Sequence, residues 1–522
     1  MLATVPAGSH TLGMQGHSDS NRELLDAAAL CRQLVPDGSV EAFLADHRQE
    51  LFPDELFSDL FPSGRGRPSV PADVVAAVMV LQALEGLSDR EAARACRDRI
   101  SWKVACGLAL DDEGFHHSVL TYWRTRLRTS ERPERIFEAV RAVIEATGVL
   151  RGRIRRALDS TLLDDAVATQ DTVTQIISAI RRVRKEVPAA AEVVLEAHDY
   201  DRGTKPVIAW DDPVAKEHLV SALVGDALAL IDTTQGAELT ADQRDAVGML
   251  ALVAGQDVEL GEEEGTWRIA EQVAHDRVIS TVDPEARHMH KSRSSYRDGY
   301  KAHIVVEPET GLVTAAALTP ANAADGPVGV ELLAAEAPGL EVLADSAYGS
   351  GEVRAALEKA EHRALIKPIP LRPAVPGGFT IDEFTIDTAE GVVTCPRGIT
   401  VAVSRTGIAT FGTRCRGCPI RDRCTRSRTG RTITVHPHHD LLFAARRDAG
   451  TEGFRHPYRR HRPMVERSIA WLVAQGHRRV RYRGVVRNQM GLTHRVAAIN
   501  LRRLVNLGLG HDGGWILASA PT

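Results

Sequence analysis

Three carboxylates stand where the chain passes from apolar residues into small or polar ones. Asp159 follows a short apolar step in "RRALDSTLLDDA", and Asp345 ends the apolar run of "LEVLADSAYG". Glu466 lies among apolar residues in "RHRPMVERSIAWL", where the neighbouring charges are arginines. Carboxylate oxygens are the ligands that Mg²⁺ prefers, although each of these acids taken alone fits a solvated surface group better. Whether the three form a metal site depends on the elements that carry them.

Three further acids follow Asp159 closely, namely Asp164, Asp165 and Asp171. We interpret Asp164 and Asp165 as loop or helix-cap groups, and Asp171 as a solvated surface carboxylate. Within this acidic stretch, only Asp159 stands at the end of a strand-like run, which is where ligands gather in open α/β sheets.

A second set of candidate ligands is a cluster of four cysteines in "CPRG" and "CRGCPIRDRC". Its members are Cys395, Cys415, Cys418 and Cys424. Four thiols that include one C-x-x-C pair suit a tetrahedral structural zinc site, and without a secretory signal such a cluster indicates a metal before a disulfide. Four reduced thiols without a metal are the alternative.

Basic residues surround this cluster, and we expect them to lower the thiol pKa values and to contact phosphate. The arginines are Arg414, Arg416, Arg421 and Arg423. Three nearby histidines could replace a cysteine as a zinc ligand, but we interpret them as loop residues: His436, His438 and His439.

The segments around Asp159 and Asp345 predict a mixed α/β layer. Residues 153–163 favour a strand. From Tyr300 the apolar period changes from about 3.6 to 2, which predicts two strands joined by a turn at "PETG". The helix "DGPVGVELLAAEA", the strand before Asp345, a further helix and the short strand "HRALIKP" complete the layer.

Two insertions interrupt this pattern. Residues 171–274 look almost wholly helical and carry no catalytic constellation. Residues 369–445 are rich in Pro and Gly, β-like, and contain the cysteine cluster. From Tyr458 the chain is helical again, so Glu466 is expected on a helix that packs back on the layer.

The first part of the chain has a helical period. Ser88 is a plausible helix N-cap, with Glu91 at the capping-box position. A helix, a turn at Gly86 and a second helix bearing several arginines have helix-turn-helix proportions. A plain helical bundle with a charged outer face is an equal alternative.

Composition bounds these expectations. A chain of 522 residues is too long for one ordinary core and predicts two to four domains. Residues 391–510 contain 24 Arg, no Lys and five acids, which is the charge pattern of a segment that binds a polyanion. A GC-rich genome would explain Arg over Lys but not the shortage of acids. The apolar runs are too short to span a bilayer, and the N-terminus lacks a signal-peptide pattern, so we expect a cytoplasmic protein.

The order strand-Asp, hairpin, strand-Asp, long insertion, helix-Glu resembles the ribonuclease H-like catalytic core of bacterial insertion-sequence DDE transposases. "LDSTLLDDA", "LADSAYGS" and "YRRHRPMVERSIAWL" resemble the three acidic motifs of that family. The third family motif reads Y-x2-R-x3-E-x6-K. Arg462 and Glu466 match its spacing, Tyr458 comes one residue early, and Val473 stands at the Lys position.

The resemblance implies site residues and cofactors. Asp159, Asp345 and Glu466 would be catalytic and hold two Mg²⁺ or Mn²⁺ ions, while the cysteine cluster would hold a structural Zn²⁺. Support for catalysis or contacts to DNA phosphate would come from Arg462, Tyr458 and Arg467. Candidates for the missing positive charge of the third motif are His477, Arg478 and Arg479.

The resemblance also implies a domain plan. It comprises an N-terminal helical DNA-binding domain (1–135), a discontinuous ribonuclease H-like core (150–170, 275–368 and 455–510), a helical insertion (171–274) and a Cys-rich insertion (369–445). The implied function is cleavage of double-stranded DNA at the terminal repeats of an element and joining of the 3′-OH end to target DNA, by a homo-oligomer in the bacterial cytoplasm near the nucleoid.

Three alternatives stay open at this stage. The chain could be a ribonuclease H-like nuclease that cuts without joining. It could be a non-catalytic DNA-binding remnant of a transposase or a repressor. It could also be a zinc-stabilised scaffold that does not bind DNA.

Overall fold

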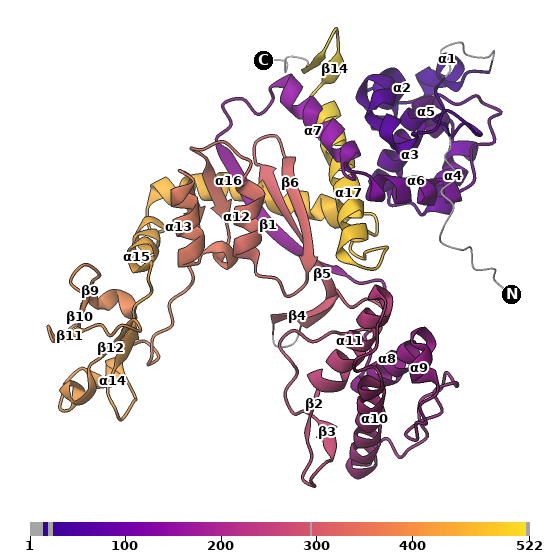
Figure 1. Ribbon diagram of the computed structural model, residues 1–522. Helices are drawn as coiled ribbons and strands as arrows, with labels where there is room; N and C mark the ends of the chain where they lie inside the picture. Colours follow the sequence, from indigo (N-terminus) through magenta and orange to yellow (C-terminus); the bar gives the residue numbers. More distant parts are fainter. Residues whose placement is uncertain (1–13, 19–24, 293–294, 518–522) are drawn as a thin grey trace.

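The centre of the molecule is a six-stranded mixed sheet with helices on both faces, which confirms the predicted α/β class (Figure 1). The computed structural model describes residues 14–18, 25–292 and 295–517. The strand order is β4-β5-β1-β7-β8, and β6 also pairs with β5. The strands are β1 (Arg155–Asp164), β4 (Arg287–Ser292), β5 (Ser295–Glu307), β6 (Leu312–Pro320), β7 (Glu341–Ala344) and β8 (Arg363–Ile366).

The strand that carries Asp159 lies in the middle of this sheet. The prediction that Asp159 ends its strand was wrong, because β1 continues past it to Asp164 and stays paired with β5. β1 pairs antiparallel with β5, placing Asp159 opposite Ile304, and parallel with β7. β5 and β6 form the predicted hairpin around "PETG". β4 was not predicted, because its sequence "RHMHKS" lacks an apolar alternation and its pairing depends on the first part of β5. The long β5 therefore joins strands on both of its edges.

The two faces of the sheet bury different side chains, because successive residues of a strand point to opposite faces. Leu158 packs with Tyr348 against the face that α12 (Asp325–Leu333) and α13 (Gly351–Lys359) cover. The approach of α12 requires Gly329, since a Cβ there would lie 2.8 Å from side-chain atoms of both Leu158 and Tyr348. Ala157 packs on the opposite face with residues of α16 (Glu452–Val473) and α17 (Val485–Asn506). Asp159 shares this second face.

Helices form the first part of the chain, as predicted. They are α1 (Ala27–Cys31), η1 (Arg32–Leu34), α2 (Val40–Leu51), η2 (Asp54–Leu60), α3 (Ala72–Glu85), α4 (Asp89–Asp98), α5 (Ile100–Cys106), α6 (Ser118–Thr129) and α7 (Arg135–Thr147). Gly86 ends α3 in the left-handed conformation at φ +74°. Ser88 and Glu91 form the predicted capping box at the start of α4.

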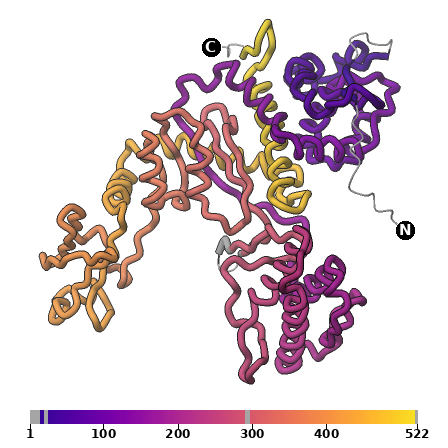
Figure 2. Tube along the Cα trace, viewed as in Figure 1, coloured from indigo at the N-terminus to yellow at the C-terminus, as the bar shows by residue number. Residues whose placement is uncertain are grey.

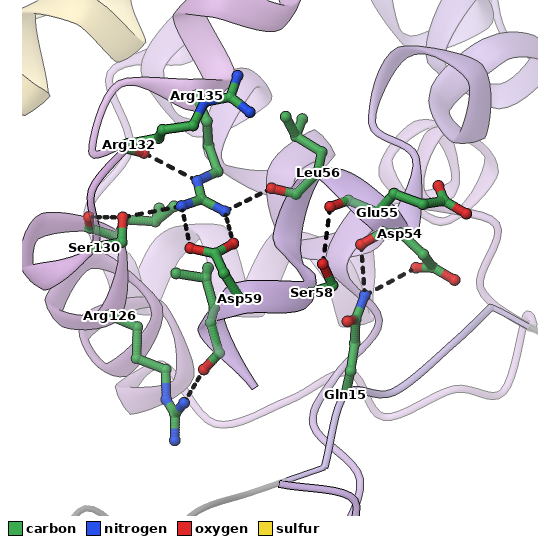
Figure 3. Close-up of polar contacts among 12 residues, drawn as sticks. Gln15, Asp54, Glu55, Leu56, Ser58, Asp59, Arg126, Ser130, Arg132 and Arg135 are labelled. Carbon is green, nitrogen blue, oxygen red and sulfur yellow. Dashed lines mark hydrogen bonds and ion pairs between the residues drawn. The ribbon is translucent and has the colours of Figure 1, made fainter. Parts of the chain in front are cut away.

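A buried arginine ties the helices of this region together (Figure 3). Arg135 at the start of α7 is 1% exposed. Its guanidinium donates to both carboxylate oxygens of Asp59 at 2.5 and 2.8 Å, to the Leu56 carbonyl and to Ser130 Oγ. These hydrogen bonds to Arg135 hold the pKa of Asp59 below its usual value. η2 and the loop after α6 are thereby fixed to α7.

The N-terminal helices are also bound to the central layer. The C-terminal end of α3 leaves backbone carbonyls without helical partners, and three side chains that follow α16 or lie on α17 satisfy them. His477 bonds to the Ala83 carbonyl at 2.9 Å, and Arg495 donates to the same carbonyl and to that of Leu84. Arg481 donates to the carbonyls of the turn at Gly86. The turn between α3 and α4 is therefore held by α17 and by the segment between α16 and α17.

The segment 171–274 forms a helical arm below the sheet in Figure 1, with its own buried apolar cluster. It contains α8 (Thr172–Glu186), α9 (Pro188–Ala191), α10 (Pro213–Thr233) and α11 (Ala241–Gln256). A short hairpin of β2 (Val258–Leu260) and β3 (Trp267–Ile269) is the exception to the predicted helical character, and β3 packs on α10.

The segment 369–445 forms a second arm, which leaves the sheet on the side of α13 and α15 (Figure 2). It contains η4 (Ile381–Glu383), β9 (Thr385–Asp387), β10 (Val392–Thr394), β11 (Thr400–Ala402), β12 (Ile408–Thr410), η5 (Gly412–Cys415), α14 (Arg421–Cys424) and β13 (Thr432–Thr434). α15 (His439–Asp448) returns the chain to the layer. η3 (Ser346–Tyr348) follows β7, and β14 (Leu509–His511) and β15 (Trp515–Leu517) form a hairpin after α17.

In the described part of the chain, no helix is both long and apolar enough to cross a membrane.

Candidate active site

Asp159 faces α16 and is paired with an arginine of that helix. Arg462 Nη1 donates to Asp159 Oδ2 at 3.1 Å, and Nη2 lies at the same distance from that oxygen. Both side chains are largely buried, at 7% exposure for Arg462 and 17% for Asp159. The other carboxylate oxygen, Oδ1, accepts from the Ser160 backbone amide at 2.9 Å. Residues 303 positions apart thus form one ion pair at the middle of the sheet.

Burial raises the pKa of Asp159 above its ordinary value, because a charged carboxylate loses solvation. Arg462 opposes this rise, while the negative charge of Asp345 adds to it. Burial is the largest influence on the pKa of Arg462 and lowers it, but the charge and hydrogen bond of Asp159, together with the charges of Tyr458 and Asp345, make the net shift upward. A bound cation would relieve the repulsion between the Asp159 and Asp345 carboxylates.

Asp345 lies directly after β7, beside β1. Its carboxylate accepts from the Ala347 amide at 2.9 Å and so caps η3. β7 runs parallel to β1, so both acids stand near the same edge of the layer. The predicted strand that ends in Asp345 is confirmed.

Glu466 lies on α16 one turn beyond Arg462. Tyr458, Arg462 and Glu466 are each four residues apart, and residues at this spacing are neighbours on one helix face. Tyr458, which comes one residue early for the family motif, therefore remains on the face that carries Arg462. Glu466 is exposed, whereas Arg462 is buried. The helix thus presents a phenol, a guanidinium and a carboxylate in one row.

Tyr458 joins this row to the end of β7. Its hydroxyl donates to the Ala344 carbonyl at 3.3 Å, one residue before Asp345. Burial raises the pKa of the Tyr458 phenol, and the charges of Asp345 and Glu466 act in the same direction against that of Arg462. Asp345, Arg462 and Glu466 are therefore all electrostatic neighbours of one side chain.

The three acidic side chains lie near one another, but their carboxylate oxygens do not converge on one point. Among the described residues, Asp159, Asp345 and Glu466 do not form a group whose oxygens all lie within 4.8 Å of one another. Arg462 supplies a positive charge at Asp159 in this arrangement. The oxygen donors suit a hard divalent cation, and binding it would require the acids to approach further.

One basic residue at the site was not identified from the sequence. Lys367 directly follows β8, and its ammonium lies 5.3 Å from the centre of the Tyr458 ring, a cation–π contact. Its backbone amide donates to the Ala344 carbonyl at 3.2 Å. Lys367 is exposed. The sequence signal that could have identified Lys367 is its position at the end of a third parallel strand, in "HRALIKP".

The basic candidates that follow α16 lie elsewhere. Arg478 Nη1 donates to Thr161 Oγ1 and to the Leu162 carbonyl on β1, both at 2.8 Å. Arg479 donates to the Asp165 carbonyl, and His477 bonds to the N-terminal helices. Arg467 is exposed. Burial lowers the pKa of Arg503, and the positive charge of Arg467 lowers it further. A supporting role for Arg467 stays a prediction.

Two of the remaining acids of the opening stretch have structural partners, and the third is buried. Asp164 is the last residue of β1, not a loop group as expected, and pairs with Arg297 at 2.6 Å. Asp171 caps α8 by accepting from the Thr174 amide. Asp165 is buried at 6% exposure.

The four cysteines gather in one place on the second arm. Together with Phe384, Ile399 and Phe411, they line one small cavity: Cys395, Cys415, Cys418 and Cys424. Among the described residues, no three of these sulfurs lie within 4.8 Å of one another, so a shared metal ion would require the loops to close. Four thiols facing one cavity still suit zinc.

The expected lowering of thiol pKa values by arginine does not hold at Cys424. Burial raises the pKa of its thiol, and the neighbouring cysteines add to the rise, while Arg431 only partly offsets it. Of the arginines predicted to lower it, Arg414 and Arg421 line the same cavity as the cysteines, Arg416 lies at the surface, and Arg423 stacks 4.6 Å from the Phe379 ring centre.

Two family models match the chain. The model for the transposase DDE domain matches residues 394–505, and that for a transposase domain (DUF772) matches residues 31–126. The first includes the cysteine cluster, Arg462 and Glu466, whereas neither covers Asp159 or Asp345. No curated protein and no solved structure matches.

Proposed function

Because these two matches identify the chain as a DDE transposase of the insertion-sequence type, we propose that it cuts DNA at the ends of its element and joins the 3′-OH end to target DNA. The observation that carries the proposal is the convergence of Asp159, Asp345 and the Glu466 helix around the Arg462 and Tyr458 side chains. The metal-dependent chemistry of the site and the strand-transfer step rest on this arrangement and on the resemblance.

The sheet supports a ribonuclease H-like core. Three antiparallel strands, β6, β5 and β1, continue into the parallel strands β7 and β8. This order places the first acid on the central strand and the second after its parallel neighbour. The third acid comes from a helix that packs on β1. These are the positions that the resemblance predicts for a DDE triad.

Asp159, Asp345 and Glu466 would hold two Mg²⁺ or Mn²⁺ ions, since they offer the oxygen donors that such ions prefer. When bound, the ions activate an attacking oxygen and stabilise the leaving oxygen of a phosphodiester. Arg462 balances the buried charge of Asp159. When a metal ion balances that charge instead, Arg462 would move aside or turn toward a DNA phosphate. Tyr458 holds the end of β7 against α16 and so positions Asp345.

Lys367 would bind a DNA phosphate beside these acids. Its ammonium is exposed and held over the Tyr458 ring, so it supplies the positive charge that Val473 cannot. A Lys367→Ala variant that binds and cleaves DNA like the wild type would remove Lys367 from the proposed site.

The partners follow from charge and domain matches. The N-terminal helices, which the DUF772 model matches, would bind the terminal repeats, with α3, the turn at Gly86 and α4 acting as a helix-turn-helix. The Arg-rich segment 391–510 would bind the phosphate backbone. We also propose a structural Zn²⁺ at the cysteine cavity, a homo-oligomer as the working form, and a place near the bacterial nucleoid.

The test is Mg²⁺-dependent cleavage of DNA that carries the element's own ends. Asp159→Asn should lower the cleavage rate by at least about 10³-fold, because several kcal/mol of transition-state stabilisation is lost. The matched control is Asp164→Asn on the same strand, which should retain activity since Asp164 pairs with Arg297. Equal cleavage by wild type and Asp159→Asn would contradict the proposal.

The same preparation separates the alternatives. Pre-cut donor ends are supplied with a target plasmid, and joined products are measured. Cleavage without joining would identify a nuclease. Binding without cleavage by the intact protein would identify a non-catalytic remnant, and the absence of salt-sensitive binding would identify a scaffold.

A further inference from the structure

The C-terminal hairpin meets α2 at a group of three metal-binding side chains. His47 and Glu50 come from α2, and His511 comes from β14. One ligand atom from each residue lies within 4.8 Å of the others. The group is separate from both the carboxylates of the active site and the cysteine cavity, and it joins the two ends of the chain.

The surroundings of this group favour ligation. Among the described residues, the ring nitrogens of His47 and His511 and the Glu50 carboxylate have no hydrogen bond or ion pair, so their lone pairs are available. Trp515 packs edge-on against His511, with ring centres 4.8 Å apart, and lies 6.2 Å from His47. The Phe43 ring centre lies 5.2 Å from that of His47 and 5.9 Å from that of Trp515, so the three rings pack together. The aromatic rings limit the rotamers of both histidines.

The backbone of α2 is irregular at this group. α2 is kinked at His47, whose φ of −135° and ψ of 15° are not helical. His47 and Glu50 are three residues apart, a spacing that keeps two side chains on one side of a helix. β14 then brings His511 from the other chain end.

We propose that His47, Glu50 and His511 bind a divalent transition-metal ion, with zinc the best match. Two imidazoles and one carboxylate are a common three-residue zinc set, with a fourth position left to water. Imidazole ligands disfavour Mg²⁺ and Ca²⁺, which take oxygen donors. The ion would join the β14–β15 hairpin to α2 and so hold the segment that follows α17 against the N-terminal helices.

Cobalt is the probe, because Co²⁺ takes zinc positions and quenches nearby tryptophan fluorescence. Co²⁺ is titrated into the full-length protein while emission is recorded. Trp515 adjoins His511, so binding should quench one of the six tryptophans. Trp515→Phe should abolish the saturable part of the response. Co²⁺ bound by cysteines gives a sulfur charge-transfer absorption, which identifies binding at the other arm separately.

Two variants test the ligands. His511→Ala and Glu50→Gln should each weaken the quenching transition by at least about 10-fold, because a lost ligand removes one of three protein bonds. The control is His218→Ala, since His218 is exposed on α10 in the helical arm and should leave the transition unchanged. Wild-type quenching in both ligand variants, or no saturable quenching in the wild type, would overturn the assignment.

Discussion

The helical arm (171–274) and the Cys-rich arm (369–445) both project from the central sheet but are stabilised differently (Figure 1). Among the described residues, the helical arm buries nineteen apolar side chains in one cluster and the Cys-rich arm only seven. A core of seven is too small to stabilise a domain without a disulfide or a metal. The difference indicates that the cysteines stabilise the Cys-rich arm, whereas apolar packing stabilises the helical arm.

The arms also differ in charge. Residues 171–274 contain 20 acidic and 9 basic residues, whereas residues 395–435 contain one acidic residue and nine arginines. DNA attracts the second arm and repels the first. We therefore expect the Cys-rich arm to contact DNA and the helical arm to lie away from it.

The largest effect should come from removing a thiol of the Cys-rich arm. Cys424→Ser should abolish zinc binding and unfold the arm, because the free energy of a structural zinc site, about 10–16 kcal/mol, is folding energy. Hydrogen exchange of residues 379–435 measures the loss. Cys31→Ser, outside the arm, is the control. Protection equal to the wild type in Cys424→Ser would show that apolar packing suffices.

Charge removal on the same arm should produce the next effect. The exposed residues Arg414, Arg416, Arg426 and Arg428 are changed together to Gln. Affinity for duplex DNA should fall by about 10²–10³-fold at low salt, and the salt slope should decrease by up to about 4.

The matched control for charge lies on the other arm. Glu262, Glu263 and Glu264, also exposed, are changed to Gln. This variant should bind DNA as well as the wild type or slightly better. Similar losses in both variants would remove the distinction between the arms.

A cavity in its apolar core should destabilise the helical arm, whereas removal of metal ions should not. Leu223 is fully buried at 0% exposure, so Leu223→Ala should destabilise the arm by about 2–5 kcal/mol. Hydrogen exchange should accelerate in residues 172–256 and stay unchanged in β1 and β5. EDTA should leave the helical arm protected. Loss of protection across the whole chain would show that the arm is not an independent unit.

The smallest effect concerns the root of the helical arm. Burial raises the pKa of Asp165 to about 6, helped by Asp298 and Asp283, and its Oδ2 lacks a hydrogen-bond partner among the described residues. A raised carboxyl pKa means that the native state binds the proton more tightly, so stability falls as pH rises from about 4 to about 6 and stays low above.

Asp165→Asn should remove this penalty. Thermal stability should rise by about 1–3 kcal/mol at pH 7.5 and remain near that of the wild type at pH 4. Asp211→Asn, exposed in the same arm, is the control. An equal gain at both pH values would show that the effect is not one of charge.

Local patterns predicted much of the fold. The β5–β6 hairpin, the strand before Asp345 and the Ser88–Glu91 capping box depend on neighbouring residues, and all are confirmed. The strand around Asp159 was also predicted, but Asp159 lies within it and not at its end. β4 was missed because its pairing comes from β5 and not from its own composition.

Contacts between distant segments were harder to predict. The Arg462–Asp159 pair joins two motifs whose individual spacing was recognised, but the pair itself arises only when α16 packs on β1. Lys367 and His511 belong to no local motif, since their neighbours at Tyr458 and His47 are distant in sequence. Only the folded chain brings them together.

The central claim is that Asp159 and Glu466 act in one site. The most direct measurement is the DNA cleavage rate of Asp159→Asn, Glu466→Gln and the double variant, with DNA binding and thermal stability recorded for each. Residues that act as a unit have non-additive effects. We expect each single change to lower the rate by at least about 10³-fold and the double variant to be no slower than either. Independent, multiplicative losses, or wild-type cleavage by either single variant, would contradict the claim.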